Sequence, residues 1–147
     1  MQLPIQKLHP NAVLPTRATS GSAGLDLYAC LDAPLCIPGH GHALVPTGIA
    51  IALPTPKEAA AFVFARSGLA VKHGLGLLNA VGVIDSDYRG EIRVGMVNQF
   101  DEDYTLQPGE RIAQLVILPI LLPELRELDT LPETERGAGG FGSTGKA

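Results

Sequence analysis

The chain of 147 residues lacks features that mark several large protein classes. It contains no tryptophan, three tyrosines, four phenylalanines and only two cysteines. Cys30 and Cys36 are six positions apart, and we expect them to be a reduced, buried pair in a cytoplasmic protein rather than a disulfide. No stretch reaches the roughly 18 apolar residues of a membrane span. The N-terminus, MQLPIQKLHP, lacks the charged start and apolar run of a signal peptide.

Positive charge is also scarce. Eleven lysines and arginines face 15 aspartates and glutamates, which gives a net charge of −4. This balance argues against a nucleic-acid polymer as partner, because such binding depends on many phosphate contacts by basic side chains. It does not exclude a small anion that is held by a few local cations.

Glycine and proline are plentiful instead. The 17 glycines and 12 prolines are spread along the chain rather than pooled. This distribution is typical of turns between short strands and is incompatible with a helical bundle. We therefore expect one all-β domain, a jelly-roll or distorted β-barrel, with one short helix and a flexible glycine-rich C-terminal arm.

Alternating hydrophobicity marks the predicted strands. In GIAIALP, Ile49 and Leu53 share one face with Ile51, and in EIRVGMVNQF, Val94 shares one face with Ile92 and Met96. The run RIAQLVILPILL carries one polar residue, Gln114, and predicts a strand that is buried on both sides.

One helix is expected, over residues 67–73, with Ser67 as its N-cap. After Pro123 the alternation gives way to an acidic connector. We expect residues 1–132 to form the barrel and residues 133–147 an arm of the same functional unit.

The end of the chain, RGAGGFGSTG, concentrates glycine around a single aromatic residue, Phe141. A disordered tail is the simplest interpretation. GFGSTGK resembles a P-loop, but that motif requires Ser or Thr next and then a helix, and here only Ala147 follows. The physical chemistry still suits phosphate, because glycine backbone N–H groups and the Arg136 guanidinium bind its oxygens.

The segment GVIDSDYRG holds the most distinctive carboxylate. It is not a calcium loop, because Arg89 and Met96 stand where that loop needs ligands. An ordinary hairpin whose aspartates hold the turn is one interpretation. The other is that a tight hairpin fixes Asp85 as a general base, with Tyr88 as a flat wall three residues later.

Two further segments offer phosphate-binding chemistry. In ARSGLAVK, a Ser-Gly step opens the short helix with free N–H groups, and Arg66 supplies charge. In AGLDLYA, Asp26 is either a solvent-facing residue or the holder of a hydrated metal. Gln114 must find partners for its amide, either in the protein or in a water and phosphate.

A zinc site is a weaker possibility. Cys36, His40 and His42 are close in sequence, but their spacing is not that of a zinc site, and turn residues are the better interpretation. The zinc deaminase signature, H-x-E followed by P-C-x-x-C, is absent.

Taken together, AGLDLYA, ARSGLA, GVIDSDYRGE, ERIAQLVI and RGAGGFGSTG resemble the five ordered motifs of the trimeric dUTPases. The resemblance runs from about Leu3 to the C-terminus. One departure is Ala65, where many members carry proline. The resemblance implies a homotrimer of jelly-roll subunits with three active sites at subunit interfaces, each built from three chains, with dUTP as the small-molecule substrate.

For the arm and the phosphates, the resemblance implies these roles. Phe141 stacks on uracil, while the outer phosphates are held by Arg136, Gly142 and Ser143. The triphosphate is cradled by Arg66, Ser67 and Gly68.

For the nucleoside pocket, the resemblance implies that Asn79 and the backbone of Val83 and Ile84 read the uracil edge. Tyr88 packs on the deoxyribose, and Arg93 also lines the pocket.

For the reaction, the resemblance implies catalytic roles for Asp85, Gln114 and Arg66. Asp85 deprotonates a water that attacks the α-phosphorus, giving dUMP and pyrophosphate, and Gln114 contacts the α-phosphate or that water. Mg²⁺ bridges the phosphates, with Asp26 held to it through water. The product supplies thymidylate synthesis and the reaction limits uracil in DNA.

Two alternatives share this fold. One is a dCTP deaminase-related enzyme, which the intact glycine arm disfavours. The other is an inactive dUTP-binding sensor, which the presence of both Asp85 and the arm disfavours.

Overall fold

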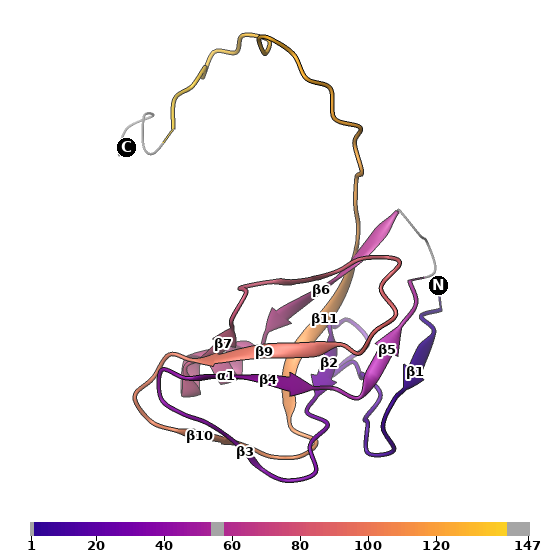
Figure 1. Cartoon of the computed structure of the whole chain (residues 1–147), viewed down its shortest axis with the longest axis vertical. Coiled ribbons are helices and arrows are strands. Elements are labelled where there is room, and N and C mark those ends of the chain that lie inside the picture. The colour runs from indigo at the N-terminus through magenta and orange to yellow at the C-terminus, as the bar shows by residue number, and fades with distance from the viewer. Residues whose placement is uncertain (1, 54–57, 141–147) are drawn as a thin grey trace.

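The computed structural model describes residues 2–53 and 58–140, and antiparallel strands make up most of it. The largest sheet has the order β2-β11-β6-β8, and a second has the order β4-β9-β7, while β1 pairs with β5 and β10 with β3. The strand bounds are β1 Ile5–Lys7, β2 Leu25–Tyr28, β3 Leu35–Ile37, β4 His42–Pro46, β5 Ile49–Ile51, β6 Ala59–Ala65, β7 Leu75–Leu77, β8 Gly82–Ile84, β9 Arg93–Asn98, β10 Tyr104–Leu106 and β11 Arg111–Pro119. Figure 1 shows that the short sheets together form a single barrel-like body, so the predicted all-β jelly-roll is confirmed.

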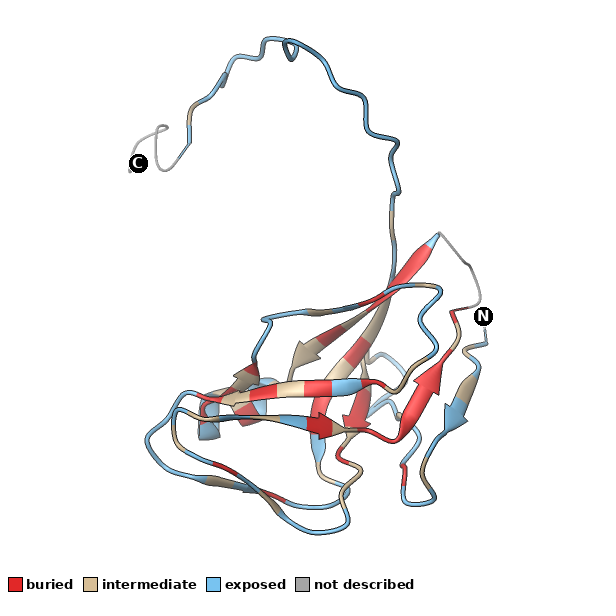
Figure 2. Ribbon diagram, viewed as in Figure 1, coloured by how far each residue is buried: buried red, intermediate tan, exposed pale blue. Residues whose placement is uncertain are grey.

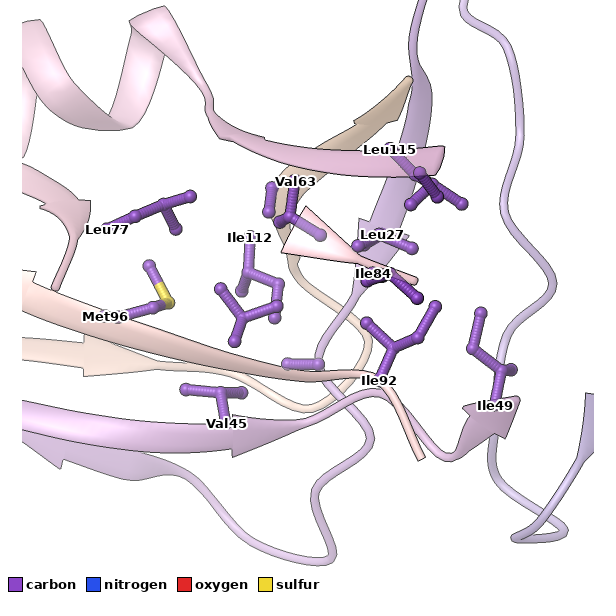
Figure 3. Close-up of a cluster of buried hydrophobic side chains, with 14 of the residues drawn as sticks. Leu27, Val45, Ile49, Val63, Leu77, Ile84, Ile92, Met96, Ile112 and Leu115 are labelled. Carbon is purple, nitrogen blue, oxygen red and sulfur yellow. The ribbon is translucent and has the colours of Figure 1, made fainter. Parts of the chain in front are cut away.

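The core lies between the sheets. Leu27, Val63 and Leu115 point inward from the four-stranded sheet, and Val45 and Met96 meet them from the three-stranded one (Figure 3). All five are at most 5% exposed. This core fixes the strands whose ends carry the functional side chains.

The alternation predicted for β9 is confirmed, because Ile92, Val94 and Met96 are all buried. In β5 both faces are covered, so Ala50 is buried together with Ile49 and Ile51. The prediction for β11 is wrong in its second half. Ile112, Ala113 and Leu115 in its first half are buried, but Leu118 is exposed, because the outer face of the four-stranded sheet is uncovered in a single chain.

The predicted helix is confirmed as α1, Ser67–His73, but its cap is not the expected one. Arg66 is the N-cap, with extended backbone and no side-chain cap hydrogen bond, and Ser67 is already helical. The helix ends at Gly74, whose φ of +65° suits glycine. A Cβ there would also collide with the ring of Phe100.

The expectation of a buried cysteine pair is wrong. Both thiols are free, but Cys36 is exposed and Cys30 is half-buried. Burial and the nearby charge of Glu91 raise the pKa of the Cys30 thiol, so it stays protonated at neutral pH.

After β11 the chain leaves the body as an extended, exposed segment (Figures 1 and 2). Leu121, Leu125 and Leu131 are each at least 80% exposed on it. The remaining arm residues, including Phe141, Gly142 and Ser143, lie outside the described residues. In the part of the chain described, no helix is long and apolar enough to cross a membrane.

Candidate active site

Six of the predicted site residues line one pocket of about 280 Å³. The pocket lies where β8 and the turn after it approach the start of β9. The six residues are Asn79, Val83, Ile84, Asp85, Tyr88 and Arg93. A cavity of this size is at the lower end of those that hold small organic ligands.

One wall of the pocket is a close-packed backbone. The N–H of Val81 donates to the Asn79 carbonyl at 2.7 Å, and Ala80 adopts a positive φ of 61° in this turn. A Cβ on Gly82 would lie 3.2 Å from the Cβ of Val63. The wall therefore has little freedom to move away from a ligand.

Asp85 and Tyr88 are the ends of a four-residue turn, in which the Tyr88 N–H donates to the Asp85 carbonyl at 3.2 Å. Arg89 holds this turn by donating to the carbonyls of Ser86 and Tyr88 at 2.9 and 2.8 Å. The predicted hairpin is wrong, because β8 pairs with β6 whereas β9 pairs with β4 and β7. The turn thus links two sheets, and its exposed carboxylate faces the pocket.

A second cluster is built on Asp26, which is 8% exposed on β2. Its two carboxylate oxygens accept from Arg66 Nε at 3.2 Å and from Arg111 Nη1 at 3.1 Å. Arg66 also donates to the Arg111 carbonyl at 3.2 Å. Asp26 is therefore neither solvent-facing nor free: it fixes two guanidinium groups that together leave a net positive charge.

Gln114 lies next to this cluster. It stands opposite Asp26 on β2 and opposite Phe64 on β6, so the three side chains share the outer face of the sheet. Gln114 is half-buried, and the exposed Ser67 and Gly68 begin α1 directly after Arg66. Arg66 and Gln114 thus lie beside Asp26, and Ser67 and Gly68 follow Arg66 in the chain.

The structure does not bring the pocket and the Asp26 cluster together within one chain. Ile84, just before Asp85, pairs with Ala61 on β6, whereas Arg66 follows the far end of that strand. The five residue-to-residue steps from Ala61 to Arg66 span roughly 16 Å at the usual strand rise. Within one chain, Asp85 and Arg66 therefore lie near opposite ends of β6.

Sequence reasoning did not assign two residues of these clusters. Arg111 was assigned only as the first residue of a predicted strand. The sequence feature that could have indicated its role is a cation at the edge of an otherwise apolar run. Glu91 lines the pocket and ion-pairs with Arg93 at 2.8 Å. The sequence signal for Glu91 was a carboxylate three residues after the end of the Asp85 turn.

No metal site of three or more His, Cys, Asp or Glu side chains exists among residues 2–53 and 58–140. The zinc alternative is unsupported there, and His40 instead pairs with Asp101 at 2.7 Å. A divalent cation near Asp26 would meet one carboxylate whose oxygens already accept from arginines. This donor set fits contact through water and does not fit a protein cage.

Comparisons with known proteins identify the family of the chain. The dUTPase family model matches residues 10–145. A curated relative from Ralstonia nicotianae, named deoxyuridine 5'-triphosphate nucleotidohydrolase, is 52% identical over 151 residues and covers 99% of each chain. The chain belongs to the dUTPase family of enzymes.

Solved structures agree on the fold. A Staphylococcus bacteriophage 80alpha dUTPase with dUPNHPP has a TM-score of 0.88 and 28% identity and covers 99% of each chain. A variant dUTPase from phage phi11 of S. aureus, at 23% identity, has a TM-score of 0.80 and covers 90% of this chain and 100% of its own. That structure is described as showing the coordination of a structural Mg(II) ion.

Proposed function

We propose that the protein hydrolyses dUTP to dUMP and pyrophosphate at sites shared between subunits. One observation supports this most strongly. A rigid-walled pocket with an exposed carboxylate and a cationic cluster both exist, but on separate parts of one chain. Family membership supplies the substrate class.

The pocket suits a pyrimidine deoxynucleoside. The Asn79 amide and the backbone of Val83 and Ile84 offer donors and acceptors to the edge of uracil. Tyr88 packs on the deoxyribose, and its ring, 46% exposed, presents an apolar face there. The inflexible wall leaves no room for the 5-methyl of thymine.

The Asp26 cluster suits the triphosphate. Arg66, Ser67 and Gly68 bind phosphate oxygens through the guanidinium and backbone N–H groups. Asp26 holds Arg66 in place before the nucleotide arrives, so less side-chain entropy is lost on binding. Arg111 adds a second cation at the same place.

In the reaction, Asp85 accepts a proton from a water molecule whose oxygen attacks the α-phosphorus. The bond between that phosphorus and the oxygen bridging to the β-phosphate breaks, and pyrophosphate leaves with the electron pair. Gln114 contacts the α-phosphate or the attacking water. Because its amide is half-buried, fewer solvent molecules compete for that contact.

Mg²⁺ is the implied cofactor, and when bound to the triphosphate it neutralises phosphate charge. Asp26 accepts a hydrogen bond from Arg66, which we assign to the triphosphate, and its position fits a contact through water.

A homotrimer brings the two clusters together. The outer face of the four-stranded sheet carries Phe62 and Phe64, stacked at 6.4 Å between ring centroids, beside Val116. The extended segment adds exposed leucines that also need covering. Packing three copies would cover these surfaces and set Asp85 of one chain against Arg66 of another.

The arm completes the site from a third chain. Arg136, Gly142 and Ser143 hold the outer phosphates, and Phe141 closes over uracil. This division of labour corresponds to a barrel of residues 1–132 and an arm of residues 133–147. We place the enzyme in the cytoplasm, where its product would supply thymidylate synthesis and its activity would keep uracil out of DNA.

A product assay tests the proposal. Incubation with Mg²⁺ and dUTP should give dUMP and pyrophosphate, while dCTP, dTTP and UTP should be turned over far more slowly. A soft apolar pocket discriminates one methyl group by about 1–3 kcal/mol, and a rigid backbone wall should reject it by more. Comparable turnover of dTTP or UTP, or a deaminated product from dCTP, would refute the assignment.

A further inference from the structure

We infer that Glu91 is a positioning residue that sets sugar selectivity by tying Arg93 and Tyr88 to the buried turn between β4 and β5. This inference rests on the proposed dUTP hydrolysis and adds a residue that the reaction itself does not require.

Both carboxylate oxygens of Glu91 are engaged. Oε1 accepts from the Gly48 N–H at 2.9 Å, and Oε2 accepts from Arg93 Nε at 2.8 Å. The Glu91 side chain is 23% exposed, whereas Arg93 is 55% exposed. An ion pair that is this open to water stabilises the fold little, so its main effect is to orient the arginine.

The Gly48 end of this bridge is rigid. Gly48 has a φ of +66°, and a Cβ there would lie 2.7 Å from the Cys30 sulfur, so the turn is tightly packed. Thr47 Oγ1 donates to the Ile92 carbonyl at 2.6 Å, and the Ile92 N–H donates to the Ile49 carbonyl at 2.9 Å. These hydrogen bonds fix the backbone next to Glu91 to the buried turn between β4 and β5.

The same backbone also holds Tyr88, the side chain that we propose packs on the deoxyribose. Tyr88 Oη donates to the Glu91 carbonyl at 3.0 Å. The Tyr88 ring also packs on Gly90 so closely that a Cβ there would collide with it. The position of the phenol ring therefore depends on where Glu91 is fixed, and the side chain of Glu91 fixes it to Gly48.

Glu91→Gln is the sharpest variant. An amide has one oxygen and a donor NH₂ group, so it can satisfy either the Gly48 N–H or the Arg93 guanidinium, but not both. We expect a rise in KM for dUTP and a fall of about tenfold in the kcat/KM ratio of dUTP to UTP, the usual worth of one charge-assisted hydrogen bond. Glu102→Gln removes the same charge at an exposed loop position and should leave both quantities unchanged.

Two further variants separate the parts of the inference. Glu91→Gln should raise the KM for dUTP less when it is added to the Arg93→Gln variant than when it is added to the native protein. The reason is that the Arg93 guanidinium, which Glu91 orients, is already absent from that variant. Tyr88→Phe should lower the dUTP-to-UTP ratio while leaving the bridge to Gly48 intact, and it remains informative if the Glu91 variant fails to fold.

These measurements separate failure of the inference about Glu91 from failure of the proposed function. If the native protein does not hydrolyse dUTP selectively, the proposed function fails. If it does, but Glu91→Gln folds, by thermal melting, with an unchanged dUTP-to-UTP ratio, the inference is overturned and the function stands. Independent, multiplicative effects of Glu91→Gln and Arg93→Gln would likewise overturn the link through Arg93.

Discussion

Replacing Asp85 by asparagine is expected to lower the kcat for dUTP by about 10²–10⁴, the usual contribution of a positioned general base. The amide occupies the same space and cannot accept the proton of the attacking water. Because the turn is held by Arg89 and by the Tyr88 N–H, its backbone geometry should survive the change. Affinity for a non-hydrolysable imido analogue of dUTP, measured by calorimetry, should change little.

Asp87→Asn is the matched control. Asp87 is exposed in the same turn, two residues away, and does not line the pocket. It removes the same charge from the same neighbourhood, so its kcat should remain near the native value. Near-native turnover by the Asp85 variant, or an equal loss in both variants, would show that Asp85 is not the base.

The grouping of several site residues around one pocket could be predicted because they are close in the chain. Asn79, Val83, Asp85 and Tyr88 fall within ten positions, and a short strand followed by a tight turn keeps such residues together. The bounds of α1 were equally local, since Gly74 ends the helix through its own backbone conformation.

Features that depend on long-range packing were not predictable in the same way. Arg111 reaches Asp26 only because β11 pairs with β2 across 85 positions of sequence. The hairpin prediction failed for the same reason: β8 and β9 are neighbours in sequence, but each finds its partner in a different sheet. Ser67 suits an N-cap by residue type, yet Arg66 takes that position as it leaves β6 to reach Asp26.

Deleting residues 136–147 is expected to abolish turnover while leaving the melting temperature almost unchanged. In the described part of the arm, Arg136 and Gly137 hydrogen-bond only to Gly139 and Thr134, within the arm itself. A segment with one large apolar residue contributes little to a core. Under the proposed function, the deletion nevertheless removes a cation, the N–H groups proposed to bind phosphate and the aromatic residue proposed to close over uracil.

Phe141→Ala should be a milder form of the same defect, because stacking of an aromatic side chain on a base is worth about 1–3 kcal/mol. Its kcat/KM for dUTP should fall roughly 10- to 100-fold at unchanged melting temperature. Normal dUTP hydrolysis by the truncated chain would contradict a catalytic role for the arm.

Mixing the truncated chain with the Asp85→Asn chain then tests whether sites are shared. Each parent lacks one component, and neither homotrimer has a complete site. In a mixed trimer, Asp85 of a truncated chain can meet the intact arm of an Asp85→Asn chain, so partial activity should appear once subunits exchange. Within one chain the Asp85 and Arg66 ends of β6 are roughly 16 Å apart along the strand, which supports sites that draw on more than one chain. Absence of rescue despite subunit exchange, verified by mass spectrometry of differently tagged chains, would mean that each arm closes over its own chain.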